Sequence, residues 1–305
     1  MQWAILLSSG RDREGAAAPS RGRSLEPGDA ASPPCHGLSP PVCHNAGMTI
    51  SVIPVEGLPL IRKGDDLPSL IHARVPLRDG DILSMAHTVY SKAHGHTRAL
   101  PSITPSPRAI RIAEQDGEDP RFVQAVLDEA QEVILEHPFI LSVMKNGHIG
   151  VRSGVDRSNI EDGMVILLPP DPMAAAEGIR ARIREVSGSS VGVIITDTVG
   201  RSFRRGQTGH AIGWAGMTAI RDFRSDTDLF GHVLKITEEA VVDEIAGFAN
   251  FVMGESHQGT PSVVFRNCPP WKGHDHLFFR PEEDVMRKAL CTLPREFISR
   301  GDDTD

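Results

Sequence analysis

The sequence predicts an α+β fold in which strands and helices are mixed, and three observations support this prediction. Apolar runs typical of strands are separated by amphipathic segments typical of helices. The two kinds of segment do not alternate regularly, and no GxGxxG or GxxxxGKT loop opens a βαβ unit, so a doubly wound nucleotide-binding sheet is not indicated. The chain has 305 residues, of which 40% are hydrophobic, enough to bury one large core or two modest ones.

The apolar runs and the first long helix can be placed along the chain. Strands are predicted at residues 50–55, 82–88, 164–168, 191–196 and 262–266. A helix is predicted over residues 120–135, because it begins with Pro120, which is favoured at the first helical position. Its apolar and acidic faces separate at helical spacing, through Phe122, Val126, Glu129 and Val133.

Three further helices are expected towards the C-terminus. One begins at Thr237, a residue type that caps helix N-termini, and ends at Gly254, a residue type that ends helices. The others follow Pro172 and Pro281. No internal repeat is visible in the sequence.

Composition limits the function classes. The formal net charge of −8 argues against a nucleic-acid partner, because phosphate backbones require a surplus of Lys and Arg. Aromatic residues make up 5% of the chain, so base-stacking platforms are not expected. No apolar stretch approaches the roughly 20 residues of a membrane span. The four cysteines lack short repeated spacing, which is typical of a reducing compartment, so we expect a soluble cytoplasmic enzyme.

The first part of the chain differs in composition from the rest. Residues 1–47 are rich in Pro, Ser, Gly, Ala and Arg and cannot bury enough apolar area to offset their ordering entropy, so a disordered extension is predicted there. The folded region is expected over residues 48–305, with Met48 as a candidate translation start. A Pro-rich coil offers no regular elements for tetrahedral zinc ligation, which argues against a zinc site formed by Cys35, His36, Cys43 and His44.

The densest polar signal lies in residues 191–217. Its apolar run is expected to present Asp197 and Thr198 at the carboxyl end of a strand, where the chain turns at Gly200. A rigid strand with an open tip suits a binding site. A carboxylate beside a hydroxyl supplies hard oxygen ligands, which suit Mg²⁺ or Mn²⁺ better than zinc.

Three arginines follow at once, interspersed with glycines: Arg201, Arg204 and Arg205. Guanidinium groups form bidentate contacts with phosphate or carboxylate, and glycines let backbone N–H groups approach an anion closely. The segment therefore predicts an anion site. The alternative is a flexible basic loop on the surface.

Three weaker clusters add polar residues. Asp156 and Asn159 lie on one turn and can face the same ligand, although both are also ordinary turn residues. His87 and Thr88 end the strand at residues 82–88, and the lysine that follows, Lys92, is either a phosphate ligand or a solvated side chain.

Glu255 is the last of these candidates. It comes directly after the helix that ends near Met253. A carboxylate is disfavoured at a helix C-terminus unless a cation compensates it. The alternative is a solvated loop.

Six segments, taken in order, resemble the coenzyme F420:L-glutamate ligase family, and together they run from about residue 50 to 290. They are "VEGLPLIRKGDDL", "TVYSKAHG", "SGVDRSN", "GVIITDTVGRSFRRGQTGHAIGWAG", "TDLFGHVLKITEEAVVDEIAGFANFVMGE" and "GTPSVVFRN". The resemblance implies a GTP-dependent ligase that adds L-glutamate to the precursor F420-0 through gamma-linked amide bonds, giving F420-1 and longer products and releasing GDP and phosphate. It also implies a two-domain gamma-glutamyl ligase fold in an intertwined homodimer, here in the standalone form.

The resemblance also implies roles for individual residues. Positions that hold divalent metals in the family, expected to be two Mg²⁺ or Mn²⁺ ions with K⁺ as a further candidate, match Asp156, Asp197, Thr198 and Glu255. Positions that contact GTP match Leu58, Pro59, Leu60, Ile61, His87, Thr88, Lys92, Asn159, Met253, Gly254, Ser256, His257, Gln258, Gly259 and Thr260. The chain departs from the family at His94 and His96, which we give no role.

A mechanism follows as a hypothesis. A carboxylate must be activated before an amine can attack it to form an amide. Transfer of a nucleotide γ-phosphate to the carboxylate activates it as an acyl phosphate. Metals near Asp197 would neutralise charge during transfer, and Arg201, Arg204 and Arg205 would hold the anionic precursor or the acyl phosphate. Two alternatives use the same residues, a metal-dependent phosphohydrolase and a nucleotide-binding protein without turnover.

Overall fold

The computed structural model describes residues 49–145 and 147–292. All of them belong to one compact unit that begins at Thr49. The predicted disordered extension at residues 1–47, with the cysteines and histidines discussed as zinc ligands, lies outside the described residues.

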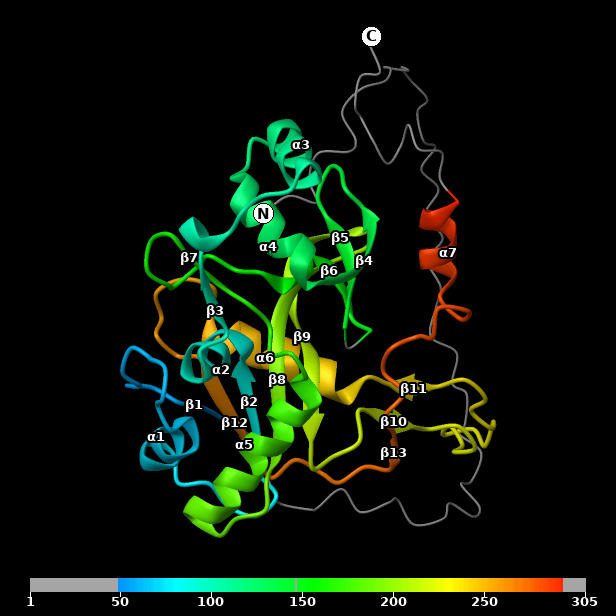
Figure 1. Ribbon diagram of the computed structural model, residues 1–305. Coiled ribbons are helices and arrows are strands. Elements are labelled where there is room, and N and C mark those ends of the chain that lie inside the picture. The colour runs from blue at the N-terminus through cyan, green and yellow to red at the C-terminus, as the bar shows by residue number, and fades with distance from the viewer. Residues whose placement is uncertain (1–48, 146, 293–305) are drawn as a thin grey trace, which may run out of the picture. The chain divides into compact units, whose positions relative to one another are not determined.

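A five-stranded sheet forms the centre of the described unit (Figure 1). Its strand order is β1 (Ser51–Pro54), β12 (Ser262–Arg266), β2 (Ile82–Ala86), β8 (Gly192–Arg201) and β9 (Arg204–Ala215). Only the β2–β8 pair within this sheet is parallel, and its other neighbours are antiparallel. The mixed α and β prediction is therefore confirmed.

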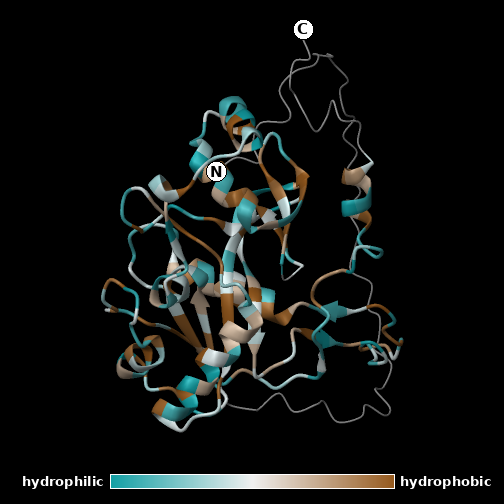
Figure 2. Ribbon diagram, viewed as in Figure 1, coloured by the Kyte–Doolittle hydropathy of each residue, from teal (hydrophilic) through white to brown (hydrophobic). Residues whose placement is uncertain are grey.

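Helices cover both faces of this sheet and enclose two hydrophobic cores. Alternate residues of β8 point to opposite faces, so Val193 and Ile195 join one core and Ile194 joins the other. The first core is completed by α1 (Leu67–Arg74), α2 (His87–His94) and α5 (Pro172–Ser187), and the second by α6 (Val241–Met253). The central strands are coloured mainly as hydrophobic in Figure 2, as burial on both faces requires.

Smaller elements surround the central sheet. One group packs around its own core and comprises β3 (Thr97–Ala99), η1 (Leu100–Ser102), α3 (Pro107–Asp116), α4 (Pro120–Glu129), β4 (Ala130–Leu135), β5 (Leu141–Met144), β6 (Ile149–Val151), η2 (Arg152–Gly154) and β7 (Met164–Ile166). A three-stranded sheet contains β11 (Glu238–Glu239), β10 (Ile220–Asp222) and β13 (Gly273–His274), and α7 (Val285–Cys291) contacts β4 through the ion pair of Arg287 with Glu132.

The helix predicted over residues 120–135 is wrong in its second half. The helix α4 ends at Glu129, and the residues from Ala130 form β4, which pairs with β5. The burial of β4 does not alternate regularly, since Glu132 is exposed and Ile134, two residues on, is buried, and the register of β4 with β5 shifts twice. Long-range pairing with β5, and not a local pattern, therefore makes this segment a strand.

Three other boundaries also differ from the prediction. The strand expected at residues 82–88 ends at Ala86, because His87 begins α2. The helix expected from Thr237 begins at Val241, because the residues just before it pair with β10 as β11. The helix expected after Pro281 is α7, which begins a turn later behind the N-cap Asp284.

The turn predicted at Gly200 is also absent, because the strand continues. Gly200 pairs with Gln207, and the hairpin between β8 and β9 turns at Ser202 and Phe203 instead. The remaining predicted elements are confirmed as β1, β7, the first part of β8, α5 and β12.

Glycines on β9 allow helices to lie directly on the sheet. A Cβ added at Gly209 would lie 2.5 Å from the carbonyl oxygen of Ala246 in α6, and one added at Gly213 would lie 2.2 Å from the carbonyl oxygen of Pro172 in α5. Both distances are shorter than a Cβ tolerates. The two glycines therefore set how closely α6 and α5 approach β9.

Replacing Gly209 by Ala is expected to lower the free energy of unfolding by about 1–3 kcal/mol, the usual cost of overpacking, because α6 must move away from β9. Urea unfolding followed by circular dichroism measures this. Gly178→Ala on the exposed side of α5 is the matched control, since no atom lies within 4 Å of the added Cβ, and it should stabilise the protein by about 0.5–1 kcal/mol. Equal effects of the two substitutions would contradict the prediction.

Candidate active site

The parallel pair of β2 and β8 brings His87 and Asp197 together. In its register Ala86 lies opposite Thr196, so His87 and Asp197 follow side by side at the point where β2 ends and β8 continues along β9. His87 Nε2 lies 3.3 Å from Asp197 Oδ1. Because His87 is also the first residue of α2, the carboxylate lies at the N-terminus of that helix, where a negative charge is favourable.

Asp197 is held in its ionised form. Burial alone would raise the pKa of its carboxyl group. The hydrogen bond and charge of His87 and the backbone N–H of Thr198, which donates to Oδ1 over 2.8 Å, help to outweigh burial and lower the pKa below its ordinary value. The site therefore carries a fixed negative charge at neutral pH.

Thr198 faces α6 and the loop that follows it. Its hydroxyl donates to Glu255 Oε1 over 3.0 Å, and Asn250 Nδ2 donates to the same hydroxyl over 3.0 Å. Asn250 Nδ2 also donates to Glu255 Oε1. The predicted ligands Thr198 and Glu255, 57 residues apart in sequence, are therefore in direct contact.

A second loop carries Asp156 and Asn159 towards the same place. Asp156 accepts hydrogen bonds from the backbone N–H and the hydroxyl of Ser158, over 2.8 and 2.5 Å, which fixes the turn. Asn159 Nδ2 donates to the carbonyl oxygen of Ser256 over 3.4 Å. Because Ser256 follows Glu255, the predicted clusters at residues 156–159 and 253–260 meet.

Lys92 joins these loops from α2. Its ammonium group donates to the carbonyl oxygen of Asn159 over 3.1 Å. Burial lowers the pKa of Lys92 below its ordinary value, whereas the charges of Glu161 and Asp156 act in the opposite direction. The four polar clusters predicted from the sequence thus form one continuous set of contacts, from His87 and Asp197 through Thr198, Glu255 and Asn159 to Lys92.

The loop after α6 is held by its own side chains. Gly254 has a φ of 71° and donates its N–H to the carbonyl oxygen of Asn250, which ends the helix after the buried Met253. Within the loop, the backbone N–H of Ser256 donates to Gln258 Oε1 over 2.9 Å. Further hydrogen bonds link His257 to Ser256 and Thr260 to Gln258, and Gly259 has a φ of 67°.

The predicted arginines lie on a β-hairpin and not on a flexible loop. Arg201 ends β8 and lies opposite Arg204, which begins β9. The Arg201 Nη2 atom donates to the carbonyl oxygen of Arg205 over 3.5 Å, and the Arg201 Nε atom is buried without a hydrogen-bond partner in the described residues. Arg204 and Arg205 are exposed. Their guanidinium groups are therefore free to meet an anion.

The predicted segment from Leu58 to Ile61 is linked to the other predicted site residues through α2. Ile61 is buried in the first core and Leu60 is 87% exposed. Gly64 donates its N–H to the carbonyl oxygen of Ala93 over 2.8 Å, so this segment approaches the C-terminal end of α2. Thr88 is the second residue of α2.

Sequence reasoning missed two residues of α6 that face the site. Asp243 Oδ1 accepts the backbone N–H of Ala211 over 2.8 Å, beside a β-bulge of β9, and Asn250 contacts Thr198 and Glu255. The two residues are seven positions apart and share one face of the helix. Two polar side chains on one stripe of a helix whose only other polar side chain is Glu244 were the signal that could have found them.

A group of possible metal ligands also lies outside the predicted site, at Asp222, Glu238 and His274. Among residues 49–145 and 147–292, three ligand atoms of His, Cys, Asp or Glu lie within 4.8 Å of one another at Asp222, Glu238 and His274, and Asp156, Asp197 and Glu255 form no such group. The side chain of Arg224 contacts both carboxylates of the second group, over 2.6 and 3.3 Å, and already supplies their positive charge.

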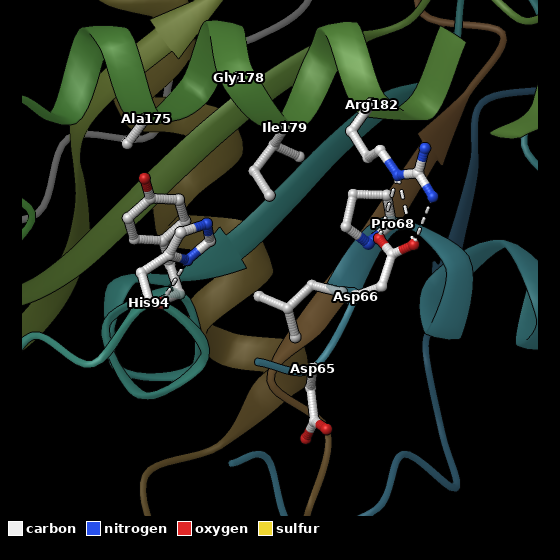
Figure 3. A pocket seen from close by; sticks show the side chains of 10 residues that line it. Asp65, Asp66, Pro68, His94, Ala175, Gly178, Ile179 and Arg182 are labelled. Carbon is white, nitrogen blue, oxygen red and sulfur yellow. Dashed lines mark hydrogen bonds and ion pairs between the residues drawn. The ribbon is translucent and has the colours of Figure 1, made fainter. Parts of the chain in front are cut away.

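A shallow pocket lies away from these contacts, between α1, α2 and α5. Its volume is about 220 Å³. Figure 3 shows Asp66 and Arg182 paired at one end and His94 at the other. His94 stacks on Tyr90 with ring centroids 4.0 Å apart. His94, which we gave no role from the sequence, lines this pocket.

The donor atoms at the main site suit a hard cation. Asp197, Thr198 and Glu255 offer two carboxylates and a hydroxyl, the oxygen ligands that Mg²⁺ and Mn²⁺ prefer. Lys92 and the arginines of the hairpin offer positive groups for an anion. This arrangement can bring a metal ion and a phosphorylated ligand together.

The family and the relatives that this chain matches carry closely similar descriptions. The family described as F420-0:Gamma-glutamyl ligase matches residues 57–267. A relative from Archaeoglobus fulgidus is 49% identical over 245 residues, which cover 80% of this chain and 98% of the relative. Relatives from Haloarcula marismortui and Methanosarcina acetivorans are 48% and 45% identical, over 79% and 82% of this chain and 97% and 100% of their own. All three are named coenzyme F420:L-glutamate ligase.

No helix within residues 49–145 and 147–292 combines the length and the apolar character needed to cross a bilayer.

The lowered pKa of the buried His148 side chain predicts how the free energy of unfolding depends on pH. Burial lowers its pKa from 6.5 to about 4, against the charge of Asp197. As the pH falls below 6.5, His148 is protonated in the unfolded chain but stays neutral in the folded chain until about pH 4. The free energy of unfolding therefore falls across this window, by about 3 kcal/mol in total.

Urea unfolding in EDTA between pH 7 and 4.5 should show this dependence on pH, and His148→Gln should reduce it. His232→Gln is the control, because the His232 side chain is 80% exposed. An unchanged slope in His148→Gln would refute the assignment.

Proposed function

The chain belongs to the F420-0:gamma-glutamyl ligase family, and we propose that it joins L-glutamate to the coenzyme F420 precursor F420-0 through gamma-linked amide bonds. The relatives that carry this activity in their names match over 97% or more of their own length. The observation that carries the proposal is the contact of Thr198 with Glu255 and of Asn159 with both Lys92 and Ser256, which unites clusters scattered over the chain. F420-0, L-glutamate and a homodimeric partner copy are the partners proposed.

GTP is the proposed source of activation. A carboxylate resists attack by an amine in water, and phosphorylation gives it a leaving group, so an acyl phosphate accounts for amide formation with release of GDP and phosphate. Lys92 supports this proposal, because its ammonium group lies among the loops at residues 156–159 and 253–260. The ammonium group of a lysine is a compact positive charge that commonly binds phosphate.

Divalent cations fit the donor set of the same site. Asp197, Thr198 and Glu255 would hold one ion and Asp156 would contribute to a second, with Mg²⁺ or Mn²⁺ as the ions and K⁺ as a further candidate. Bound there, a divalent cation neutralises charge on phosphate oxygens. The task of the chain itself is to keep Asp197 ionised, which His87 and the Thr198 backbone N–H do.

The hairpin arginines are proposed to bind the anionic precursor or its acyl phosphate. Arg201 leaves its Nε atom without a partner in the described residues although that atom is buried. Arg204 and Arg205 are exposed beside it on β9. Planar guanidinium groups match carboxylate and phosphate oxygens in pairs.

Asp197→Asn should leave the fold intact and reduce glutamate addition to below about 1% of the wild-type rate, because the site loses its fixed charge. Mass spectrometry of products from F420-0, GTP and L-glutamate measures the added glutamate, and circular dichroism checks the fold. Glu185→Gln on the surface of α5 is the control. Normal turnover by Asp197→Asn would remove this residue from the mechanism, and phosphate release without added glutamate mass in the wild type would indicate a phosphohydrolase.

Lys92→Met should raise the KM for GTP about 10- to 100-fold, because the phosphate loses a charge-assisted contact. Initial rates at varied GTP concentration measure this effect. Lys145→Met serves as the control, since the Lys145 side chain is 60% exposed and lies on the segment after β5. A KM equal to that of the wild type would show that Lys92 does not contact the nucleotide.

A further inference from the structure

Asn250 holds two of the proposed metal ligands at once. Its side-chain Nδ2 donates to Thr198 Oγ1 over 3.0 Å and to Glu255 Oε1, while the Thr198 hydroxyl donates to the same carboxylate oxygen over 3.0 Å. A carboxylate only accepts hydrogen bonds, so the amide nitrogen, and not the amide oxygen, must face Glu255. Three side chains from β8, α6 and the following loop thus form a closed triangle.

The hydrogen bonds of this triangle leave Thr198 able to bind a cation. A hydroxyl has one proton and two lone pairs. The proton points to Glu255 and one lone pair accepts from Asn250, so the second lone pair is available. The amide donor therefore fixes which lone pair of Thr198 stays open.

The packing of α6 on β9 puts Asn250 in this place. Gly209 lies directly opposite Thr198 in the β8–β9 register. A Cβ at Gly209 would lie 2.5 Å from the Ala246 carbonyl oxygen and 2.7 Å from the Asn250 Cβ. One turn of α6 therefore lies on the bare backbone of Gly209, and the side chain of Asn250 reaches past it to the hydroxyl of Thr198.

The helix does not need this side chain. The backbone carbonyl of Asn250, and not its amide group, accepts the N–H of Gly254 that ends α6. The neighbouring glycine on the same face, Gly247, lies against Thr208, with its added Cβ 3.2 Å from Thr208 Oγ1. Backbone contacts thus dock α6 without help from the Asn250 amide.

We propose that Asn250 is a positioning residue that holds Thr198 and Glu255 in ligand geometry before a divalent cation arrives. The inference rests on the proposed function, in which these two residues bind the cation. Without the amide donor, the carboxylate of Glu255 sits on a loop with no other fixed donor than the Thr198 hydroxyl among the contacts described. Substitution of such outer partners of metal ligands commonly weakens metal affinity about 10- to 100-fold.

The test is Mn²⁺ binding to the full chain, measured by isothermal titration calorimetry without nucleotide. Asn250→Ala is expected to weaken Mn²⁺ binding about 10-fold, while its melting temperature in EDTA falls by only about 2–4 °C, because the better helix propensity of alanine partly offsets the loss of two hydrogen bonds. Asn267→Ala is the control for loss of an amide hydrogen bond, because Asn267 likewise donates its amide to another segment, at Thr49. Its φ of 63° adds a backbone cost that Asn250 in α6 does not have, so Asn267→Ala should lower stability at least as much without weakening Mn²⁺ binding.

A double-substitution cycle excludes a general structural effect. In the background of Glu255→Gln, Asn250→Ala should weaken Mn²⁺ binding less than it does in the wild type, because the carboxylate that it orders is gone. Fully additive effects would overturn the proposal. So would unchanged Mn²⁺ affinity in Asn250→Ala.

Asp197→Asn separates the two levels of the argument. If Asp197→Asn weakens Mn²⁺ binding and Asn250→Ala does not, the positioning role is wrong and the proposed function stands. If neither substitution changes Mn²⁺ binding, the proposed metal site itself is wrong. If Asn250→Ala weakens binding as much as Asn267→Ala does, the effect follows stability and the positioning role is refuted.

Discussion

The pairing of β8 with its two neighbours determines the contacts of Asp197 and Thr198. The parallel pairing with β2 ends at Ala86 and Thr196, so Asp197 emerges beside the first residue of α2. The antiparallel pairing with β9 continues and places Gly209 opposite Thr198. A slip of one residue in either register would turn each side chain of β8 to the other face of the sheet. Both hydrophobic cores oppose such a slip, because the alternation of β8 fills them.

The same alternation spreads the site over both faces of the sheet. Asp197 has the parity of Val193 and Ile195 and faces α2, whereas Thr198 has the parity of Ile194 and faces α6. Two consecutive residues would normally be separated by the sheet between them. Here β2 stops at Ala86 while β8 runs on to Arg201, so beyond that point loops from both faces meet. The hydrogen bond from Asn159 to the carbonyl oxygen of Ser256 is where they do so.

The sequence predicted β1, β12, β2 and the first part of β8, because apolar runs bounded by charges and glycines leave few alternatives, but it missed β9, whose exposed, glycine-rich first half has no such run. It predicted Asp197 and Thr198 at a binding site because a carboxylate and a hydroxyl directly follow such a run. It failed at Val133 and Gly200, where pairing with β5 and β9 decided between a helix or turn and a strand. Such long-range pairing has no local signal. The contacts of Glu255 with Thr198 and of Lys92 with Asn159 span 57 and 67 residues, so only the folded chain could unite them.

Fixed polar groups also satisfy buried charge and buried backbone around the site, and α6 supplies two of them. Asp197 sits where burial disfavours its ionised form, and fixed groups that need not reorganise, including His87 and a backbone N–H, offset that cost. The carboxylate of Asp243 accepts the hydrogen bond of the Ala211 N–H, which the bulge of β9 would otherwise leave without a partner on the sheet. Burial raises the pKa of Asp243, while this hydrogen bond and the charge of His210 act to lower it. Since Asp243 and Asn250 lie seven residues apart, one helix face satisfies a bulged strand and contacts both Thr198 and Glu255, and the close approach of α6 at Gly209 is what allows one helix to do both.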